Sequence, residues 1–153
     1  MFIKEAEFEL QREPFAQPFA FKGASFREKW NLVVRLRNVE GPWVYGLGGL
    51  AVLWSDARVF ANHGEVGGNA LMMTLLERGL GLVRSRSFAS PQAMFYEIMP
   101  QVLSYGRSVT RQEDLRPTFA LNALVALDNA AWMLWAQQED IDGFDELIPV
   151  RYH

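Results

Sequence analysis

The chain has 153 residues, 50% of them hydrophobic, with no cysteine and a net charge of −3. That length and apolar content suffice for one domain with a substantial core. The basic residues are scattered, which excludes the positive patch of a nucleic-acid-binding protein. The lack of cysteine excludes disulfides and thiolate metal sites, and it agrees with a cytoplasmic location.

The N-terminal third has the alternating pattern of strands. Residues 2–10 place apolar side chains on one side and glutamates on the other, which predicts a half-buried strand. Residues 29–38 repeat this alternation, and Val39-Glu40-Gly41-Pro42 supplies a turn before a third strand, WVYGLG. These connections are too short for a parallel crossover, so we expect an antiparallel three-stranded meander.

Beyond residue 55 the apolar spacing becomes helical. Ser55-Asp56 is a candidate N-cap, and residues 69–82 carry helical periodicity. Ser90-Pro91 predicts the start of a second helix, which we expect Pro100 to kink and Gly106 to end. Strands followed by helices predict an α+β fold, in which the meander precedes a helical bundle.

A third predicted helix, residues 117–138, begins at Pro117 and is apolar almost all round. We expect it to be packed on several sides, and its polar interruptions argue against a membrane span. Asp128 lies in its most apolar stripe. Because a buried carboxylate is costly without partners, we expect Asp128 to accept hydrogen bonds from backbone N–H groups or an arginine, in a structural rather than catalytic role.

Two segments are predicted to be long loops, residues 13–28 and residues 46–63. Both exceed the usual length of a connection, and long ordered loops in compact domains are often functional.

The helix over residues 117–138 carries a motif that resembles a known family. A three-stranded meander, two long loops and a helix containing A-L-D-x-A-x-W resemble the N-terminal capping domain of the enolase superfamily, in particular its mandelate racemase and muconate lactonising enzyme branch. That branch commonly has A-L-D-x-A-L-W-D-L, and the matching residues are Ala126, Leu127, Asp128, Ala130, Trp132 and Leu134. Met133 replaces the second aspartate, and Gly46-Leu47-Gly48-Gly49 lacks the glutamate of the family's G-x-G-E.

The resemblance implies that the catalytic residues lie elsewhere. In this family the acid-base residues and the magnesium ligands belong to a (β/α)8 barrel of about 250 residues that follows the capping domain. Residues 1–153 would then be a single capping domain without the barrel, holding no catalytic residue and no metal itself. The resemblance also implies a parent enzyme, a racemase, epimerase, cycloisomerase or dehydratase, that forms a magnesium-stabilised enolate from a carboxylate substrate. We further expect a homo-oligomer that contacts neither nucleic acid nor membrane.

In the family the two long loops fold over the barrel mouth and shape the substrate pocket. The resemblance therefore makes Phe19, Phe21, Lys22 and Trp54 the candidate substrate-binding residues, in an apolar lid that excludes water. The alternatives are that the phenylalanines are core anchors and that Lys22 is a solvated surface ammonium.

Other motifs have simpler interpretations. Gly46-Leu47-Gly48-Gly49-Leu50-Ala51 fits a dinucleotide fingerprint, but its neighbouring strand is a hairpin partner, which favours a loop. The acids of residues 139–146 lack the spacing of a calcium loop, which favours a solvated turn. A different class of function is also open, namely a stand-alone α+β protein-interaction or assembly module whose loops form the partner-binding patch.

Overall fold

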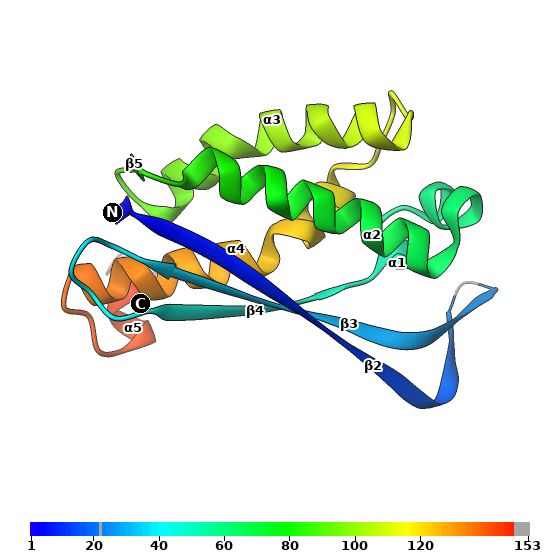
Figure 1. Ribbon diagram of the computed structural model, residues 1–153, viewed down its shortest axis with the longest axis horizontal. Coiled ribbons are helices and arrows are strands. Elements are labelled where there is room, and N and C mark those ends of the chain that lie inside the picture. The colour runs from blue at the N-terminus through cyan, green and yellow to red at the C-terminus, as the bar shows by residue number, and fades with distance from the viewer. Residues whose placement is uncertain (22, 149–153) are drawn as a thin grey trace.

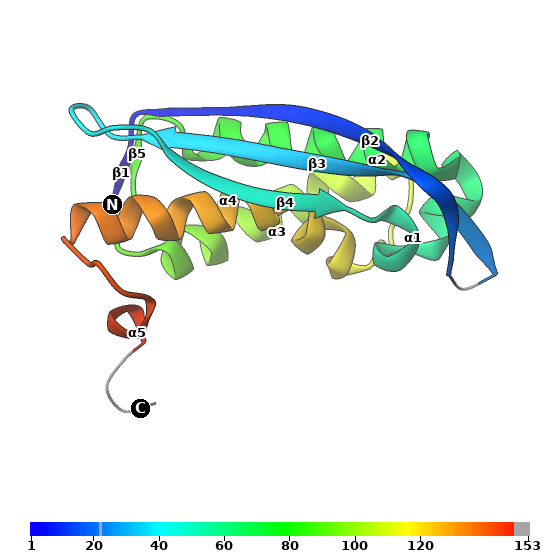
Figure 2. The same cartoon turned by 90° about the horizontal axis from the view of Figure 1, so that it is seen from below.

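The computed structural model describes residues 1–21 and 23–148 and has two layers, an antiparallel sheet and the helices that cover one of its faces (Figures 1 and 2). The elements in chain order are β1 (Phe2–Ile3), β2 (Glu5–Phe21), β3 (Ala24–Arg37), β4 (Val44–Leu50), α1 (Val52–Ser55), α2 (Ala57–Val83), β5 (Arg86–Ser87), α3 (Pro91–Thr110), α4 (Pro117–Gln138) and α5 (Phe144–Leu147). The main sheet has the order β2-β3-β4 with antiparallel pairs, and β1 pairs separately with β5. The predicted α+β fold and its meander are confirmed.

The strand alternation places one side of the sheet in the core. Leu32, Val34 and Leu36 of β3 are buried against the helices. On the opposite side Glu7 pairs with Arg35 across the β2–β3 ladder. Such an exposed ion pair contributes little to stability, so the apolar side holds the sheet in place.

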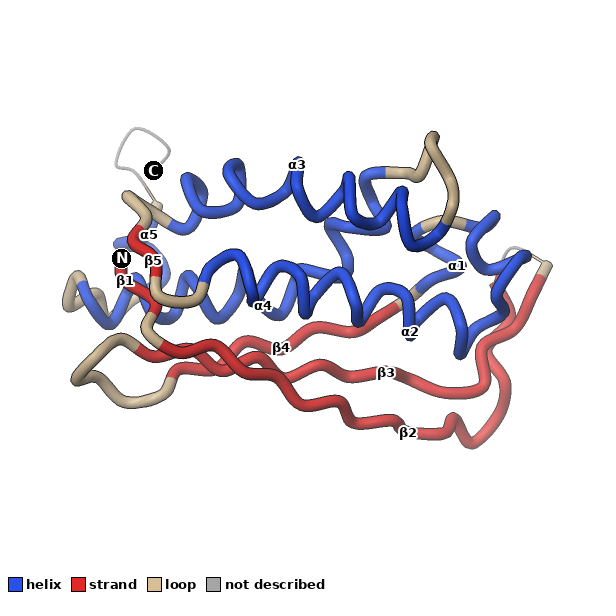
Figure 3. Tube along the Cα trace, turned by 45° about the horizontal axis from the view of Figure 1, so that its top comes forward, coloured by secondary structure: helices blue, strands red, loops and turns tan. Residues whose placement is uncertain are grey.

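Residues 13–28 are not a loop, contrary to the prediction. They form the outer part of the β2–β3 hairpin, which continues past the end of β4 (Figure 3). The pairing register shifts between Pro14 and Phe19, where Pro14 and Pro18 have no amide hydrogen for the ladder. These prolines obscured the strand in the sequence, because proline normally argues against one.

Residues 46–63 are not a loop either. They contain the end of β4, the single turn of α1 and the start of α2, which begins well before residue 69. The predicted cap is present at Asp56, whose buried carboxylate accepts hydrogen bonds from the N–H groups of Arg58 at 2.9 Å and Val59 at 3.3 Å. Gly64 interrupts α2 with a φ of 70°, a conformation that glycine adopts without strain.

The expected start of α3 is confirmed, but its expected end is wrong. The Ser90 hydroxyl accepts a hydrogen bond from the N–H of Ala93 at 3.1 Å, and the helix continues past Gly106 to Thr110. Gly106 is buried, and a Cβ there would lie 2.9 Å from a methyl carbon of Leu115. This glycine therefore serves close packing rather than helix termination.

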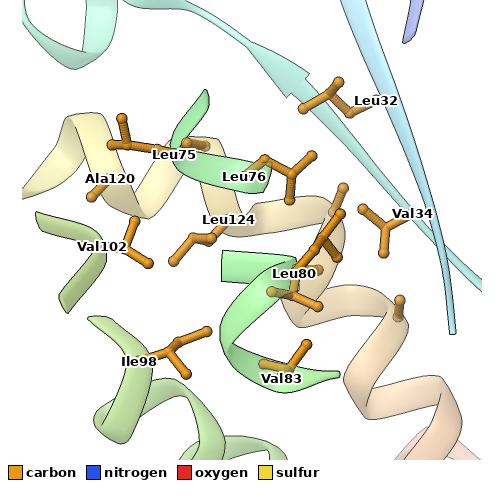
Figure 4. Close-up of a cluster of buried hydrophobic side chains, with 14 of the residues drawn as sticks. Leu32, Val34, Leu75, Leu76, Leu80, Val83, Ile98, Val102, Ala120 and Leu124 are labelled. Carbon is orange, nitrogen blue, oxygen red and sulfur yellow. The ribbon is translucent and has the colours of Figure 1, made fainter. Parts of the chain in front are cut away.

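The core lies between the sheet and the three long helices. Figure 4 shows Leu32 and Val34 of β3 with side chains from α2, α3 and α4, which include Leu76, Ile98 and Leu124. By length and composition α4 could cross a membrane. Half of its most apolar 18-residue stretch is buried in the fold, and the core helix of a globular domain has the same composition. Its packing on β4, α2 and α3 accounts for that composition.

Two glycines let β4 lie directly on α4. A Cβ at Gly46 would be 2.2 Å from both the carbonyl oxygen of Ala126 and the amide nitrogen of Ala130. A Cβ at Gly48 would be 2.8 Å from the amide nitrogen of Ala126. The G-x-G motif is thus explained by strand-to-helix packing and not by a phosphate-binding turn. The expected loop is wrong, because these glycines lie within β4.

Candidate functional site

One side of α4 is partly open to solvent, although the sides toward β4, α2 and α3 are packed. Leu121 is 41% exposed and Val125 is 38% exposed, and Trp54 of the neighbouring α1 is 53% exposed. We define the docking face as Trp54, Leu121, Val125, Asp128 and Met133. The predicted packing of this helix on several sides is confirmed by its contacts with β4, α2 and α3, and this side is the one that stays exposed. Neighbouring exposed apolar side chains of this kind are typical of binding surfaces.

A pocket of about 410 Å³ opens in the docking face between α1, α3 and α4. It is lined by Trp54, Phe95, Thr118, Leu121, Asn122, Val125 and Asp128. Farther along α4 a second hollow of about 610 Å³ lies between Met133, Leu47 of β4 and Leu147 of α5. The apolar surface therefore extends along the helix rather than stopping at one pocket.

Asn122 fixes α1, and with it Trp54, against α4. Its side-chain oxygen accepts hydrogen bonds from the N–H of Ala51 and the hydroxyl of Ser55, both at 3.0 Å. Its side-chain nitrogen donates to the carbonyl oxygen of Gly49 at 2.9 Å. One amide thus joins the end of β4, α1 and α4, which holds Trp54 in a defined position.

The structure differs from the expectation for Asp128. Its side chain is half-buried in the docking face, and no described residue donates a hydrogen bond or forms an ion pair with its carboxylate. Burial raises the pKa of Asp128 above its ordinary value. The carboxylate that accepts several backbone N–H groups is instead Asp56, which also bonds the N–H of Arg116 at 3.2 Å. Asp56 follows an apolar stretch and precedes a helix, so its sequence position indicated the cap, whereas Asp128 offered only its apolar surroundings.

The outer β2–β3 hairpin forms a separate aromatic region next to the start of α2. Phe19 is 58% exposed, and its ring centroid lies 6.4 Å from that of Phe26. The Phe26 ring meets the edge of Phe60 with a centroid distance of 6.2 Å. Phe21 is half-buried, and Lys22 lies outside the described residues. Phe26 therefore helps to anchor the hairpin to α2 through Phe60, whereas most of the Phe19 side chain is exposed.

Glu65 ties this hairpin to α2. Its carboxylate accepts hydrogen bonds from the backbone N–H groups of Arg27 at 3.0 Å and Glu28 at 3.4 Å. Glu28 in turn accepts two hydrogen bonds from the Arg12 guanidinium, at 2.7 and 2.9 Å. That guanidinium lowers the pKa of Glu28. The hairpin is thus bonded both across its own strands and to the helix beside it.

The structure groups the predicted site residues into two regions. Phe19 and Phe21 lie on the hairpin, whereas Trp54 lines the pocket on α4. Sequence reasoning missed Phe60, Glu65 and Asn122. Asn122 could have been found, because it and Asn129 are the polar residues at a seven-residue spacing in an apolar helix. Nothing in the sequence around Glu65 indicates its bonds to the hairpin.

Within residues 1–21 and 23–148 no group of three His, Asp or Glu side chains could hold a metal ion. The described residues therefore do not fit a magnesium site, and no chemical step is assigned to a metal on this chain.

The meander, the helices on one face and the hairpin beside α2 make up an α+β fold that is shared with parts of several larger solved structures. The chain is similar to part of a mandelate racemase/muconate lactonizing enzyme-like protein from Rubrobacter xylanophilus, with a TM-score of 0.60 and 17% identity over 91% of this chain and 31% of that one. It is similar to a racemase from Streptomyces coelicolor with bound magnesium, with a TM-score of 0.60 and 17% identity over 90% of this chain and 33% of that one.

A third similar structure is a substrate-liganded L-Ala-D/L-Glu epimerase from Bacillus subtilis, with a TM-score of 0.55 and 17% identity over 90% of this chain and 32% of that one. The chain thus spans about a third of the length of each of these structures. No protein-family model matches the chain, and no curated protein matches it by sequence. The predicted fold resemblance is confirmed.

Proposed function

We propose that this chain is the N-terminal capping and substrate-specificity domain of an enolase-superfamily enzyme. The observation that carries the proposal is the docking face, a solvent-exposed apolar side on a helix that packs on β4, α2 and α3. A following (β/α)8 barrel would cover that face and would supply the acid-base residues and the magnesium ligands. The chain's own share would be closure and specificity rather than proton transfer.

The outer hairpin is the element we assign to the substrate side. Phe19 and Phe21 lie toward its tip, and Glu65 fixes the hairpin to α2. Lys22 follows Phe21 in the sequence and stays a candidate for the same role. An apolar tip over a barrel mouth would exclude water from an enolate intermediate formed from a carboxylate substrate. Trp54 was a candidate for the same role, but its neighbours are Leu121 and Val125, so we assign it to the docking face.

Multi-angle light scattering on the isolated chain tests the docking face. With the face uncovered, the chain should self-associate at micromolar concentrations, and Leu121→Gln with Val125→Gln should reduce this association. Tyr96→Gln is the matched control, because Tyr96 is 81% exposed on α3 outside the docking face. A monomer that stays monomeric and binds no apolar dye would overturn the docking role and favour a stand-alone interaction module.

A second experiment tests the enzyme context. The gene is expressed through to its natural stop codon, and the product is compared with the chain of 153 residues. The proposal expects about 250 further residues and magnesium-dependent exchange of the proton α to a carboxylate. A natural stop directly after His153 would contradict it.

A further inference from the structure

The pocket in the docking face contains a carboxylate that has no partner among the described residues. Of its polar lining residues, Thr118 donates a hydrogen bond to the carbonyl oxygen of Ser55 at 2.7 Å, and Asn122 is bonded to three groups of β4 and α1. The Asp128 carboxylate has no hydrogen bond or ion pair with any residue in the described part of the chain. A surface that covers this face would stabilise the carboxylate by supplying a donor, because a fully buried carboxylate without one is strongly disfavoured.

The walls of the pocket restrict the kind of donor. Trp54 and Phe95 contribute aromatic rings, and Leu121 and Val125 contribute aliphatic surface. A strongly hydrated ammonium fits such walls poorly, whereas a guanidinium is planar, less hydrated and able to stack on aromatic rings while it binds a carboxylate through two hydrogen bonds. A metal ion is a poor fit, because a single carboxylate supplies too few ligands.

We infer that the pocket of Trp54, Phe95 and Asp128 receives an arginine side chain from the barrel domain that we propose covers the docking face. The guanidinium would pair with the Asp128 carboxylate, and its alkyl stem would lie against the aliphatic residues of α4. An open pocket of about 410 Å³ has room for one long side chain. The inference rests on the proposed docking role and adds the chemistry that selects the partner.

The arginine would also give the docking face a defined register. Leu121 and Val125 offer apolar contact that tolerates sliding along the helix, but one ion pair in a pocket fixes a single position. Burial already raises the pKa of Asp128, and a bound guanidinium would lower it again. The pKa of this carboxylate is therefore a direct report of occupancy.

The test uses the chain with N-acetyl-arginine amide as the probe, followed by NMR of the Trp54 indole and the Asp128 carboxylate. We expect saturable shifts with a Kd in the millimolar range and a fall in the pKa of Asp128. N-acetyl-citrulline amide has nearly the same shape without the charge, and it should bind at least about fivefold more weakly.

Two variants complete the experiment. Asp128→Asn should weaken probe binding at least about fivefold, and this variant should fold because no described residue depends on the carboxylate. Glu139→Gln is the matched control, an exposed acid at the end of α4 that should leave binding unchanged. Equal binding of both probes, or unchanged binding by Asp128→Asn, would overturn the inference. That result would leave the light-scattering test of the docking face unaffected, so the two failures are distinguishable.

Discussion

The two sides of α4 belong to one helix but are built from different kinds of residue. Toward β4 the helix presents Ala126 and Ala130, against which Gly46 and Gly48 place the strand backbone in direct contact. Away from β4 it presents Leu121 and Val125, larger side chains that are open to solvent. Small residues mark the side that packs on β4, and large exposed residues mark the side that we propose a partner covers. Apolar residues therefore serve two purposes on this helix, packing within the chain and exposure on the docking face, and substitutions can distinguish them.

The largest effect is expected on the closed side. Gly46→Ala would place a Cβ 2.2 Å from two backbone atoms of α4, so the strand and the helix must separate. We expect a loss of about 3 kcal/mol or more in the free energy of unfolding, measured by urea denaturation. Gly49→Ala is the matched control on the same strand, because a Cβ there would meet its nearest atom at 3.8 Å. Similar losses in the two variants would contradict the close-packing argument.

A smaller effect is expected where α4 bonds the edge of β4. Asn122→Ala would leave the carbonyl oxygen of Gly49 and the N–H of Ala51 without their partner, at a cost of about 1–3 kcal/mol. Asn129 makes one exposed bond, to the carbonyl oxygen of Leu47, so Asn129→Ala should cost about 0.5 kcal/mol. Thermal unfolding of both variants measures the two losses of stability. A larger loss in Asn129→Ala than in Asn122→Ala would contradict this prediction.

The smallest effect is expected from Asp128 on the open side. Its pKa is raised in the folded chain, so below the unfolded pKa both states are protonated and Asp128→Asn should match the parent. As pH rises through the folded pKa, the parent carries the cost of a half-buried charge, and the variant should become more stable by less than about 1 kcal/mol. Melting temperatures measured between pH 3 and pH 7 test this. A variant that is less stable at neutral pH would restore the internal hydrogen-bonded role predicted from the sequence.

Much of the fold followed from periodicity and caps. The alternation around Val34 located the central strand, and Ser90-Pro91 and Pro117 located two helix starts. The predicted helix end at Gly106 was wrong, because a glycine that allows close packing cannot be distinguished in the sequence from one that ends a helix. Only the position of Leu115 in space distinguishes the two roles.

The site was less accessible to sequence reasoning than the fold. The apolar pattern of α4 indicated burial, but it cannot say which covering layer belongs to the same chain. Pro14 and Pro18 made the outer hairpin look like a loop in the sequence. The two hydrogen bonds between Glu65 and that hairpin join residues that are 37 and 38 positions apart in the sequence. Long-range bonds of this kind leave no periodic pattern, so the residues that hold the hairpin emerge only in three dimensions.

The interrupted pairing of β2 and β3 divides one hairpin into two parts that can change independently. Up to Pro14 the register is tied to the core through pairs such as Ala6 with Leu36. From Phe19 outward a second register begins, and Phe26 contacts Phe60 of α2, whereas Glu65 bonds Arg27 and Glu28 at the interruption itself. Insertions or deletions at the interruption would alter the tip without moving the inner strands. Evolution can therefore diversify the tip while the scaffold stays constant, and a tip from another protein of this fold could be grafted at the same place.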